Sequence, residues 1–185
     1  MPEMHRSQRT IMGRIMLEKY IRDVPDFPKK GIIFKDITPL LGDYQALRQT
    51  VAELCEPFRS RGIDLVVGIE SRGFIFGSVV AQELKRGFVP IRKRGKLPFD
   101  TVSQSYDLEY GTDHIEIHSD AIPNGAKVLL IDDLLATGGT MAAACQLVTK
   151  VGGKVAGIAF VVELCFLDGR RKLTGYDVHS LIKVS

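Results

Sequence analysis

Apolar positions along the chain follow two periodicities, which predict helices and strands in alternation. Residues 43–62 carry apolar side chains at helical spacing, with Asp43 as a candidate N-cap, and we expect Pro57 to break or kink this helix. Residues 64–69 and 127–133 are short apolar runs typical of strands that are buried on both faces. The same criteria predict strands over 87–92, 115–118, 155–162 and 177–184, and helices over 73–85, 140–151 and 168–173. This alternation indicates an α/β fold with a twisted, mainly parallel sheet flanked by helices.

Two segments lack a sustained period. Residues 1–15 are polar and basic, and we expect them to form an N-terminal extension to a single domain over 16–185. Residues 93–112 are rich in turn-forming and polar types, and a structureless stretch of this length in a compact domain is often a functional lid. Parallel sheets bind their ligands beyond the carboxyl ends of the strands, so the loops that follow the predicted strands are the places to search for chemistry.

The composition narrows the class of protein. Hydrophobic residues make up 45% of the 185 and charged residues 25%, which excludes a disordered chain, a collagen and a disulfide-rich miniprotein. No apolar run approaches the roughly 18 residues of a membrane span, and no signal sequence is recognisable, so we expect neither a membrane protein nor a secreted one. The formal net charge of +3 is too small to indicate nucleic acid as a partner.

Cysteine and histidine residues show no metal-ligand spacing. Cys55, Cys145 and Cys165 are far apart and form no CxxC pair, which is typical of reduced thiols in a cytoplasmic protein. His114 and His118 fall on one predicted strand, where four residues span about 13 Å, too far for a shared metal. We therefore expect no metal site built from protein ligands.

The strongest candidate for chemistry is the strand–turn–helix of residues 128–140. Its strand delivers Asp132 and Asp133 to the carboxyl edge, and a turn follows that consists of Ala136, Thr137, Gly138, Gly139 and Thr140. Glycines let backbone N–H groups approach an anion, hydroxyls add donors, and the helix dipole favours negative charge. Hydrogen-bond donors for a phosphate, next to two acids that accept hydrogen bonds from sugar hydroxyls, are what a ribose 5-phosphate site requires. The alternative interpretation is an ordinary βα turn.

Two further segments have the right chemistry for anions. Ser71 and Arg72 end a predicted strand and open a helix, a position that favours anion binding; the alternative is a solvated arginine in a helix cap. Residues 92–96 contain four positive charges in five positions. Taken alone, that run is a solvated face or a nucleic-acid patch.

These segments together resemble the type I phosphoribosyltransferases, and among them the adenine phosphoribosyltransferases. The matching blocks are P-D-F-P at 25–28, G-I-I-F-K-D-I-T-P at 31–39, S-R-G-F at 71–74, I-R-K-R-G-K-L-P at 91–98, Y-D-L-E-Y-G at 106–111 and D-D-L-L-A-T-G-G-T-M at 132–141. They occur in the order of the family and cover about residues 20–173. The resemblance implies the type I phosphoribosyltransferase fold, with a small N-terminal hood over about 20–40 and a flexible catalytic loop over about 93–112.

The resemblance also implies roles for individual residues. Glu109 is the expected acid/base group near the purine imidazole, and Tyr110 follows it in the lid; without the resemblance, this carboxylate is simply solvated. Pyrophosphate is expected to contact Ser71, Arg72, Arg92, Lys93 and Lys96, and the loop at 71–73 often contains a non-proline cis peptide bond in this fold. Adenine is expected between Phe34 and Leu164, with Ile33 beside it; taken alone, such apolar residues belong to the core.

The activity implied is purine salvage: Mg²⁺-dependent transfer of phosphoribose from 5-phosphoribosyl 1-diphosphate (PRPP) to adenine, giving AMP and pyrophosphate. Mg²⁺ would be held mainly by PRPP and water. The resemblance further implies a cytoplasmic homodimer whose partners are adenine and PRPP, with no nucleic acid or membrane. Two alternatives stay open: an enzyme of the same fold for another purine, and a PRPP-sensing regulator that binds DNA, for which residues 1–15 are too few to supply a winged helix.

Overall fold

The computed structural model describes residues 14–107 and 111–185. The chain divides into two units, Met1–Gln49 and Thr50–Ser185. The first unit contains a 3-10 helix η1 (Leu17–Tyr20), strands β1 (Arg22–Pro25) and β2 (Ile33–Asp36), and helix α1 (Thr38–Gly42). The two strands form an antiparallel pair, and this small sheet falls within the hood expected over about 20–40.

Helix α2 (Tyr44–Cys55) begins in the first unit and ends in the second. The Asp43 carboxylate accepts a hydrogen bond of 2.8 Å from the Ala46 N–H, which confirms the predicted N-cap. The α-helical part of the predicted element ends at Cys55 and a 3-10 turn, η2 (Glu56–Phe58), follows, which confirms the break expected at Pro57. Pro57 lies in that turn and explains why the α-helix ends, because a proline inside an α-helix removes one hydrogen bond and clashes with the preceding turn.

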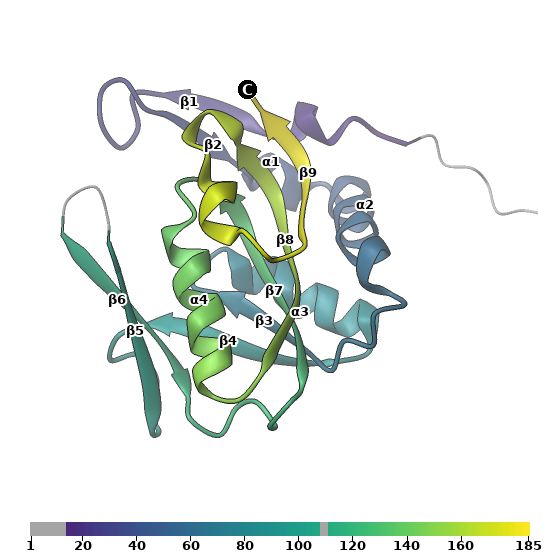
Figure 1. Ribbon diagram of the computed structural model, residues 1–185. Helices are drawn as coiled ribbons and strands as arrows, with labels where there is room; N and C mark the ends of the chain where they lie inside the picture. Colours follow the sequence, from purple (N-terminus) through teal and green to yellow (C-terminus); the bar gives the residue numbers. More distant parts are fainter. Residues whose placement is uncertain (1–13, 108–110) are drawn as a thin grey trace, which may run out of the picture. The chain divides into compact units, whose positions relative to one another are not determined.

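A seven-stranded sheet forms the centre of the second unit (Figure 1). Its strands, in the spatial order β5-β6-β4-β3-β7-β8-β9, are β5 (Thr101–Asp107), β6 (Thr112–His118), β4 (Gly87–Lys93), β3 (Leu65–Ile69), β7 (Lys127–Leu135), β8 (Lys154–Leu164) and β9 (Val178–Val184). The five neighbouring strands β4, β3, β7, β8 and β9 are parallel to one another. Strand β6 pairs antiparallel with β4, and β5 pairs antiparallel with β6. The mainly parallel α/β sheet predicted from the sequence is thus confirmed.

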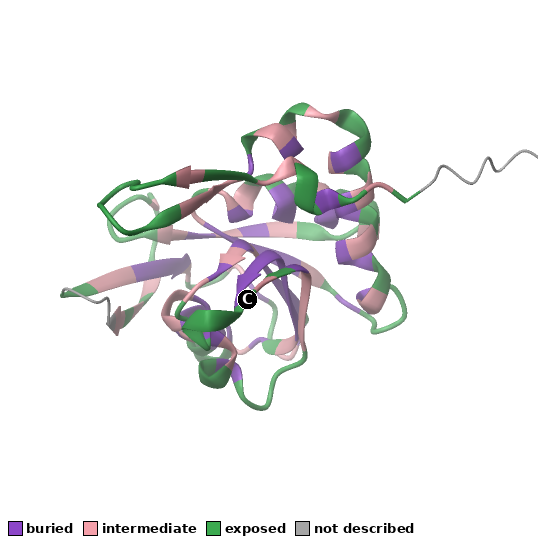
Figure 2. Cartoon of the chain, turned by 90° about the horizontal axis from the view of Figure 1, so that it is seen from above, coloured by how far each residue is buried: buried purple, intermediate pink, exposed green. Residues whose placement is uncertain are grey.

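Two helices cover opposite faces of this sheet. Helix α4 (Gly139–Lys150) packs on the face that carries Val67 and Ile69, and helix α3 (Gly73–Leu84) packs on the face of the intervening Gly68 (Figure 1). In Figure 2 the buried residues run along the interior strands and the sheet-facing sides of the helices. None of the helices in the described ranges is both long and apolar enough to cross a membrane.

The stretch 93–112 is not structureless, which corrects the expectation from its lack of period. Residues 101–107 form β5, which pairs with β6 in register from Thr101 opposite His118 to Asp107 opposite Thr112. Among its described side chains, those of residues 101–106, Val102 and Tyr106 pack against the hydrophobic core. Such sparse apolar contacts are too weak a signal for a strand, but the ladder with β6 satisfies the backbone and holds the segment extended.

After β8 the chain forms two short 3-10 turns, η3 (Cys165–Leu167) and η4 (Gly169–Leu173), before it enters β9. The helix predicted over 168–173 is therefore present as a 3-10 segment, anchored by the buried Leu173. The turn η4 follows the carboxyl end of β8, directly beside the loop that follows β7. This placement brings η4 to the candidate site.

Candidate active site

Three of the predicted anion-binding segments share one edge of the sheet. The strands β4, β3 and β7 are parallel neighbours, so the loops after residues 69, 93 and 135 all leave from the same carboxyl edge. The first and last of these loops contain the Ser71–Arg72 segment and the Ala136–Thr140 turn, and the basic turn of residues 92–96 comprises the end of β4 and the start of the loop after it. The tertiary structure therefore brings together residues that lie up to 69 positions apart, from Ser71 to Thr140.

The turn after β7, residues 136–140, lines a pocket at the N-terminus of α4. Its lining comprises Asp132, Leu134, Leu135, Ala136, Thr137, Gly138, Gly139, Thr140, Met141 and Phe160. Gly138 is the N-cap residue and has φ +77°, a left-handed conformation that glycine adopts without steric cost. The free N–H groups of the first helical turn and the helix dipole both favour an anion in this pocket.

The acid pair lies between this turn and α3. The Asp133 N–H donates a hydrogen bond of 2.9 Å to Oδ1 of Asp132, and Nε of Arg72 forms an ion pair of 2.9 Å with Oδ2 of Asp133. Gly73 lets α3 approach β7, because a β-carbon there would lie 2.9 Å from Oδ1 of Asp132. Arg72 therefore contacts the acid pair directly, in addition to being a predicted pyrophosphate ligand.

Burial raises the pKa values of both acids in the pair. The pKa of Asp132 lies well above its ordinary value, because burial disfavours the charged form and the Asp133 carboxylate adds repulsion. The pKa of Asp133 is raised by burial as well, although Arg72 opposes that effect. Such acids gain from ligands that donate hydrogen bonds to them, as the hydroxyls of a sugar do.

The loop that begins α3 contains the predicted Ser71. The peptide bond between Glu70 and Ser71 is cis, as the resemblance led us to expect for this loop. Ser71 is exposed, and its carbonyl oxygen accepts a hydrogen bond of 3.3 Å from the Phe74 N–H, which closes the turn into the helix. Ser71 and Arg72 therefore stand at the N-terminus of a 12-residue helix that points away from the sheet edge.

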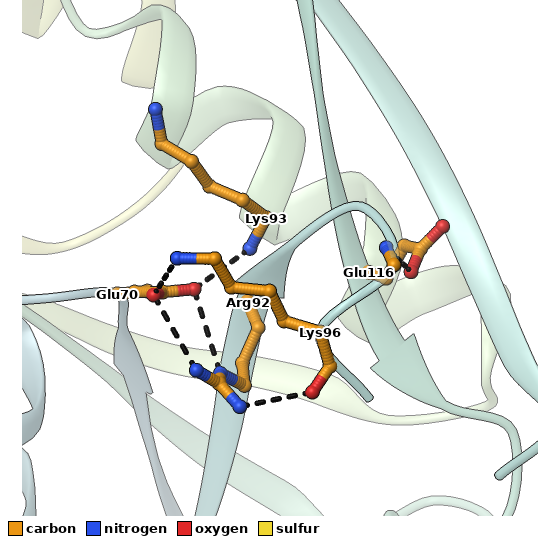
Figure 3. Close-up of polar contacts among 6 residues, drawn as sticks. Glu70, Arg92, Lys93, Lys96 and Glu116 are labelled. Carbon is orange, nitrogen blue, oxygen red and sulfur yellow. Dashed lines mark hydrogen bonds and ion pairs between the residues drawn. The ribbon is translucent and has the colours of Figure 1, made fainter. Parts of the chain in front are cut away.

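The basic turn after β4 is organised around Glu70 (Figure 3). The Lys96 ammonium lies 2.6 Å from Oε1 of Glu70, the Lys93 N–H donates a hydrogen bond of 3.0 Å to Oε2, and the Arg92 guanidinium lies 3.5 Å from the carboxylate. Arg92 also donates a hydrogen bond of 2.9 Å to the Lys96 carbonyl, across the turn. Two predicted pyrophosphate ligands, Arg92 and Lys96, are thus held side by side by one carboxylate.

Lys93 does not join this group with its side chain. Its ammonium extends away from Glu70 (Figure 3) and lies 3.2 Å from Oδ2 of Asp113 on β6, a contact that raises the pKa of Lys93 and helps to lower that of Asp113. The Tyr106 hydroxyl donates a hydrogen bond of 3.3 Å to the same oxygen. Of the three basic side chains assigned to pyrophosphate in this turn, the structure therefore brings two together and directs the third to the β5–β6 hairpin.

The residues predicted to bind adenine lie in different units. Ile33 and Phe34 are on β2, where Ile33 is exposed and the Phe34 ring makes an edge-to-face contact with Phe27 at 5.2 Å between centroids. Leu164 is buried at the carboxyl end of β8. The stacking of adenine between Phe34 and Leu164 stays a prediction, and so do the roles of Glu109 and Tyr110, which lie outside the described residues.

Glu70 is the main site residue that sequence reasoning did not identify. It precedes the S-R-G-F block and follows a buried strand, so it stands at the carboxyl edge just as Asp132 does. Burial acts to raise its pKa, but hydrogen bonds from Lys96, the Lys93 N–H and Arg92 outweigh burial, and the pKa is lowered overall. The position of Glu70 at the end of a predicted strand, together with the basic run at residues 92–96 after the next one, is the sequence signal that could have indicated the ion pair with Lys96.

The chain is similar in sequence to proteins of one family. A model of the phosphoribosyl transferase domain family matches residues 41–179. The adenine phosphoribosyltransferase of Halothermothrix orenii is 56% identical over 167 residues, which are 90% of this chain and 98% of that relative. The chain belongs to the adenine phosphoribosyltransferase family.

Solved structures of the family have the same fold. The adenine phosphoribosyltransferase of Thermoanaerobacter pseudethanolicus superposes with a TM-score of 0.89 at 53% identity, covering 91% of this chain and all of that one. The enzyme of Saccharomyces cerevisiae, in complex with D-2,5-dideoxy-2,5-imino-altritol 1,6-bisphosphate and adenine, superposes with a TM-score of 0.85 at 41% identity, covering 89% of this chain and 96% of that one. The type I phosphoribosyltransferase fold expected from the motifs is confirmed.

Proposed function

We propose that this chain catalyses the Mg²⁺-dependent transfer of the 5-phosphoribosyl group from PRPP to adenine, yielding AMP and pyrophosphate in purine salvage. The observation that carries the proposal is the arrangement at the carboxyl edge of the sheet. At that edge β7 ends in the acid pair and in a turn that opens a helix N-terminus suited to an anion, while the cations Arg72 and Lys96 follow the neighbouring strands β3 and β4. This order matches a substrate with a phosphate at one end, a sugar diol in the middle and a diphosphate at the other.

The 5-phosphate of PRPP would occupy the pocket formed by the Ala136–Thr140 turn. Backbone N–H groups at the start of α4, with the hydroxyls of Thr137 and Thr140, supply donors there, and the helix dipole adds a favourable field. The sugar hydroxyls would then donate to Asp132 and Asp133. Binding of the hydroxyls satisfies two buried acids whose pKa values are raised in the free protein.

The diphosphate would lie toward α3 and the basic turn. Arg72 lies beside the acid pair, and Arg92 and Lys96 are held together by Glu70. Charge that develops on the leaving diphosphate is best stabilised by cations that are already in place, because no reorganisation is then needed during the reaction. Glu70 serves this purpose by fixing the position of Lys96 in the absence of ligand.

In the reaction, a base nitrogen of adenine forms a bond to the anomeric carbon, and the bond from that carbon to the diphosphate oxygen breaks with its electron pair. Glu109 would accept the proton that leaves the imidazole ring. Ile33 and Phe34 of the small β1–β2 sheet, with Leu164, would supply apolar contacts to the base. Residues around 93–112, including Tyr110, would exclude water that otherwise hydrolyses PRPP.

The chemistry of the donor set at this edge is compatible with a magnesium ion that arrives with its substrate. Within 14–107 and 111–185, no group of three or more carboxylate, imidazole or thiol side chains is placed to hold a metal ion. Mg²⁺ commonly retains waters and binds through one or two carboxylates and substrate phosphates, and Asp132 and Asp133 would be the carboxylates beside the bound sugar. When bound, the ion neutralises developing charge on the diphosphate. We further propose that the enzyme is a cytoplasmic homodimer.

The proposal is tested by measuring pyrophosphate release from PRPP with adenine, hypoxanthine, guanine or xanthine as the acceptor, with Mg²⁺ and with EDTA. We expect release only with Mg²⁺, and fastest with adenine. Faster turnover of another purine would reassign the base, and equal rates in EDTA would remove the metal from the reaction. DNA binding by the purified chain without any AMP formation would support the regulator instead.

A further inference from the structure

The phosphate-binding turn is in direct backbone contact with η4. A β-carbon built on Gly169 would lie 2.1 Å from the Ala136 carbonyl oxygen and 2.9 Å from the Gly138 nitrogen. The relation is mutual, because a β-carbon on Gly138 would lie 2.3 Å from the Gly169 carbonyl oxygen. Two backbone segments that approach this closely leave no space for a side chain on either one.

Gly169 and Gly138 are glycines for different reasons. Gly138 has φ +77°, so its backbone conformation alone favours glycine. Gly169 does not adopt such a positive φ, and the closeness of Ala136 is the one reason the described structure offers for the absence of a side chain there. A substitution at Gly169 therefore tests the contact with the turn, without a change in backbone preference.

The segment η4 is itself held firmly by Arg170. Its guanidinium donates hydrogen bonds of 2.9 Å and 2.5 Å to the two oxygens of Glu163 on β8, and a third of 2.8 Å to the Val178 carbonyl at the start of β9. Glu163 is buried, and its pKa is lowered mainly by the hydrogen bonds from Arg170. The fork-like pairing fixes both the position and the orientation of η4 on the sheet.

We propose that Gly169 and Arg170 are positioning residues for the sugar phosphate: Arg170 anchors η4 to β8 and β9, and Gly169 supports the backbone of the turn that receives the 5-phosphate. This inference rests on the proposed function, which places the phosphate in that turn. Backbone N–H groups cannot rotate independently to follow a ligand, so the direction of their hydrogen bonds depends on the segments that pack against the turn. A rigid neighbour whose peptide contacts Ala136 and Gly138 provides this support.

The central experiment compares Gly169→Ala with the parent protein by calorimetric titration with ribose 5-phosphate, AMP and pyrophosphate. An added methyl group must displace the turn by roughly 1 Å, a misplacement that can cost about 10²-fold in a preorganised site. We expect ribose 5-phosphate and AMP to bind 10- to 100-fold more weakly, and pyrophosphate to bind as before. In steady-state kinetics, KM for PRPP should rise by a similar factor while KM for adenine stays constant.

Gly42→Ala is the matched control. A β-carbon at Gly42 meets nothing within 4 Å, and its φ does not lie in the positive region, so this variant changes the same atoms without a contact. We expect its binding of all three ligands to equal that of the parent. A loss of ribose 5-phosphate binding in Gly42→Ala equal to that in Gly169→Ala would contradict a specific role for Gly169.

Arg170→Lys keeps the test decisive if Gly169→Ala fails to fold. Lysine retains the charge but cannot form the two parallel hydrogen bonds to Glu163, so η4 should lose orientation while the sheet stays intact. The same selective loss is expected, with ribose 5-phosphate weakened and pyrophosphate unchanged. Unchanged ribose 5-phosphate binding in a folded Gly169→Ala or Arg170→Lys protein would overturn the inference, and an equal loss for pyrophosphate would do the same.

The two proposals fail in different ways. If the parent protein itself does not bind ribose 5-phosphate or form AMP, the proposed function is wrong. If the parent binds ribose 5-phosphate and either folded variant binds it as tightly as the parent does, the function stands and only the role of η4 is wrong.

Discussion

The Lys96 ammonium lies 2.6 Å from the Glu70 carboxylate, and this contact joins the ends of two neighbouring parallel strands. Glu70 follows β3 and Lys96 follows β4, so the ion pair spans the edge where the candidate site lies. The Glu70 side chain is 11% exposed and Lys96 is 48% exposed, so the acid is the fixed member and the lysine is the one a ligand can reach. The pair holds a cation in place before any anion arrives.

Glu70→Gln should lower the stability of the free protein. The amide has one oxygen and no charge, so it cannot satisfy Lys96, the Lys93 N–H and Arg92 together. Because Lys96 and Arg92 are partly exposed, we expect a loss of about 1–2 kcal/mol in the free energy of unfolding.

Chemical denaturation at low and high salt measures this loss. Glu56→Gln is the control, since Glu56 is 78% exposed and forms a surface ion pair of 3.4 Å with Arg59; this variant should change the free energy of unfolding by less than about 0.5 kcal/mol. A Glu70→Gln protein as stable as the parent would show that the carboxylate does not organise the turn.

Asp132→Asn should stabilise the free protein at neutral pH. Burial and Asp133 raise the pKa of Asp132 in the folded state, so the folded chain holds this proton more tightly than the unfolded chain. The stability that the group contributes is complete below the ordinary value of about 3.8 and is lost as the pH rises through the raised pKa. An uncharged amide avoids this loss.

Unfolding curves of Asp132→Asn and the parent between pH 4 and pH 8 test the direction in which their difference in stability changes with pH. We expect the advantage of Asp132→Asn to grow with pH and to reach on the order of 1 kcal/mol near pH 8. Asp120→Asn, at an exposed position outside the site, is the control variant. An advantage that shrinks as the pH rises would contradict the assignment.

The double variant Asp132→Asn with Asp133→Asn should weaken PRPP binding. Each amide can still accept from a sugar hydroxyl, but the hydrogen bond is no longer assisted by charge, which lowers its strength by roughly half. We expect Kd for PRPP to rise about 10-fold or more, with pyrophosphate affected less. Equal affinity of the double variant and the parent for PRPP would rule out the acid pair as the sugar site.

Glu109→Gln should reduce turnover far more than it reduces PRPP affinity. If Glu109 accepts the proton from the base, its amide cannot, and general-base catalysis typically contributes about 10²- to 10⁴-fold. Steady-state kinetics should show a fall of kcat in that range, with KM for PRPP changed only a few-fold. Glu83→Gln is a suitable control, because Glu83 pairs with Arg59 on the surface at 2.8 Å. If Glu109→Gln retained the parent kcat, the catalytic role would have to pass to another group.

Much of the candidate site could be predicted because its signals are local. The strand that ends at the acid pair, the turn with Gly138 and the helix that follows are contiguous, so one segment carries both the geometry and the chemistry. The cis peptide bond before Ser71 and the hood that contains Phe34 were predicted from the resemblance of whole motifs to a family, because no single residue in these segments indicates its role.

What the sequence could not supply are relationships between segments. Glu70 and Lys96 are 26 residues apart, and only the parallel pairing of β3 with β4 brings them within 2.6 Å. The strand β5 was not predicted because it is stabilised by backbone hydrogen bonds to β6, and the hydrophobic period within residues 101–107 does not indicate that partner.

The sequence by itself determined the alternation of strands and helices, and also the composition of the turn at Ala136–Thr140, because hydrophobic period and glycine chemistry act over a few residues. Only the tertiary structure decided which charges neutralise each other and which backbones touch. The Lys93 ammonium contacts Asp113 rather than Glu70, and Gly169, in the turn η4 after β8, contacts Ala136 after β7. Both outcomes depend on distances across the sheet, which are set by the order of strands and not by spacing along the chain.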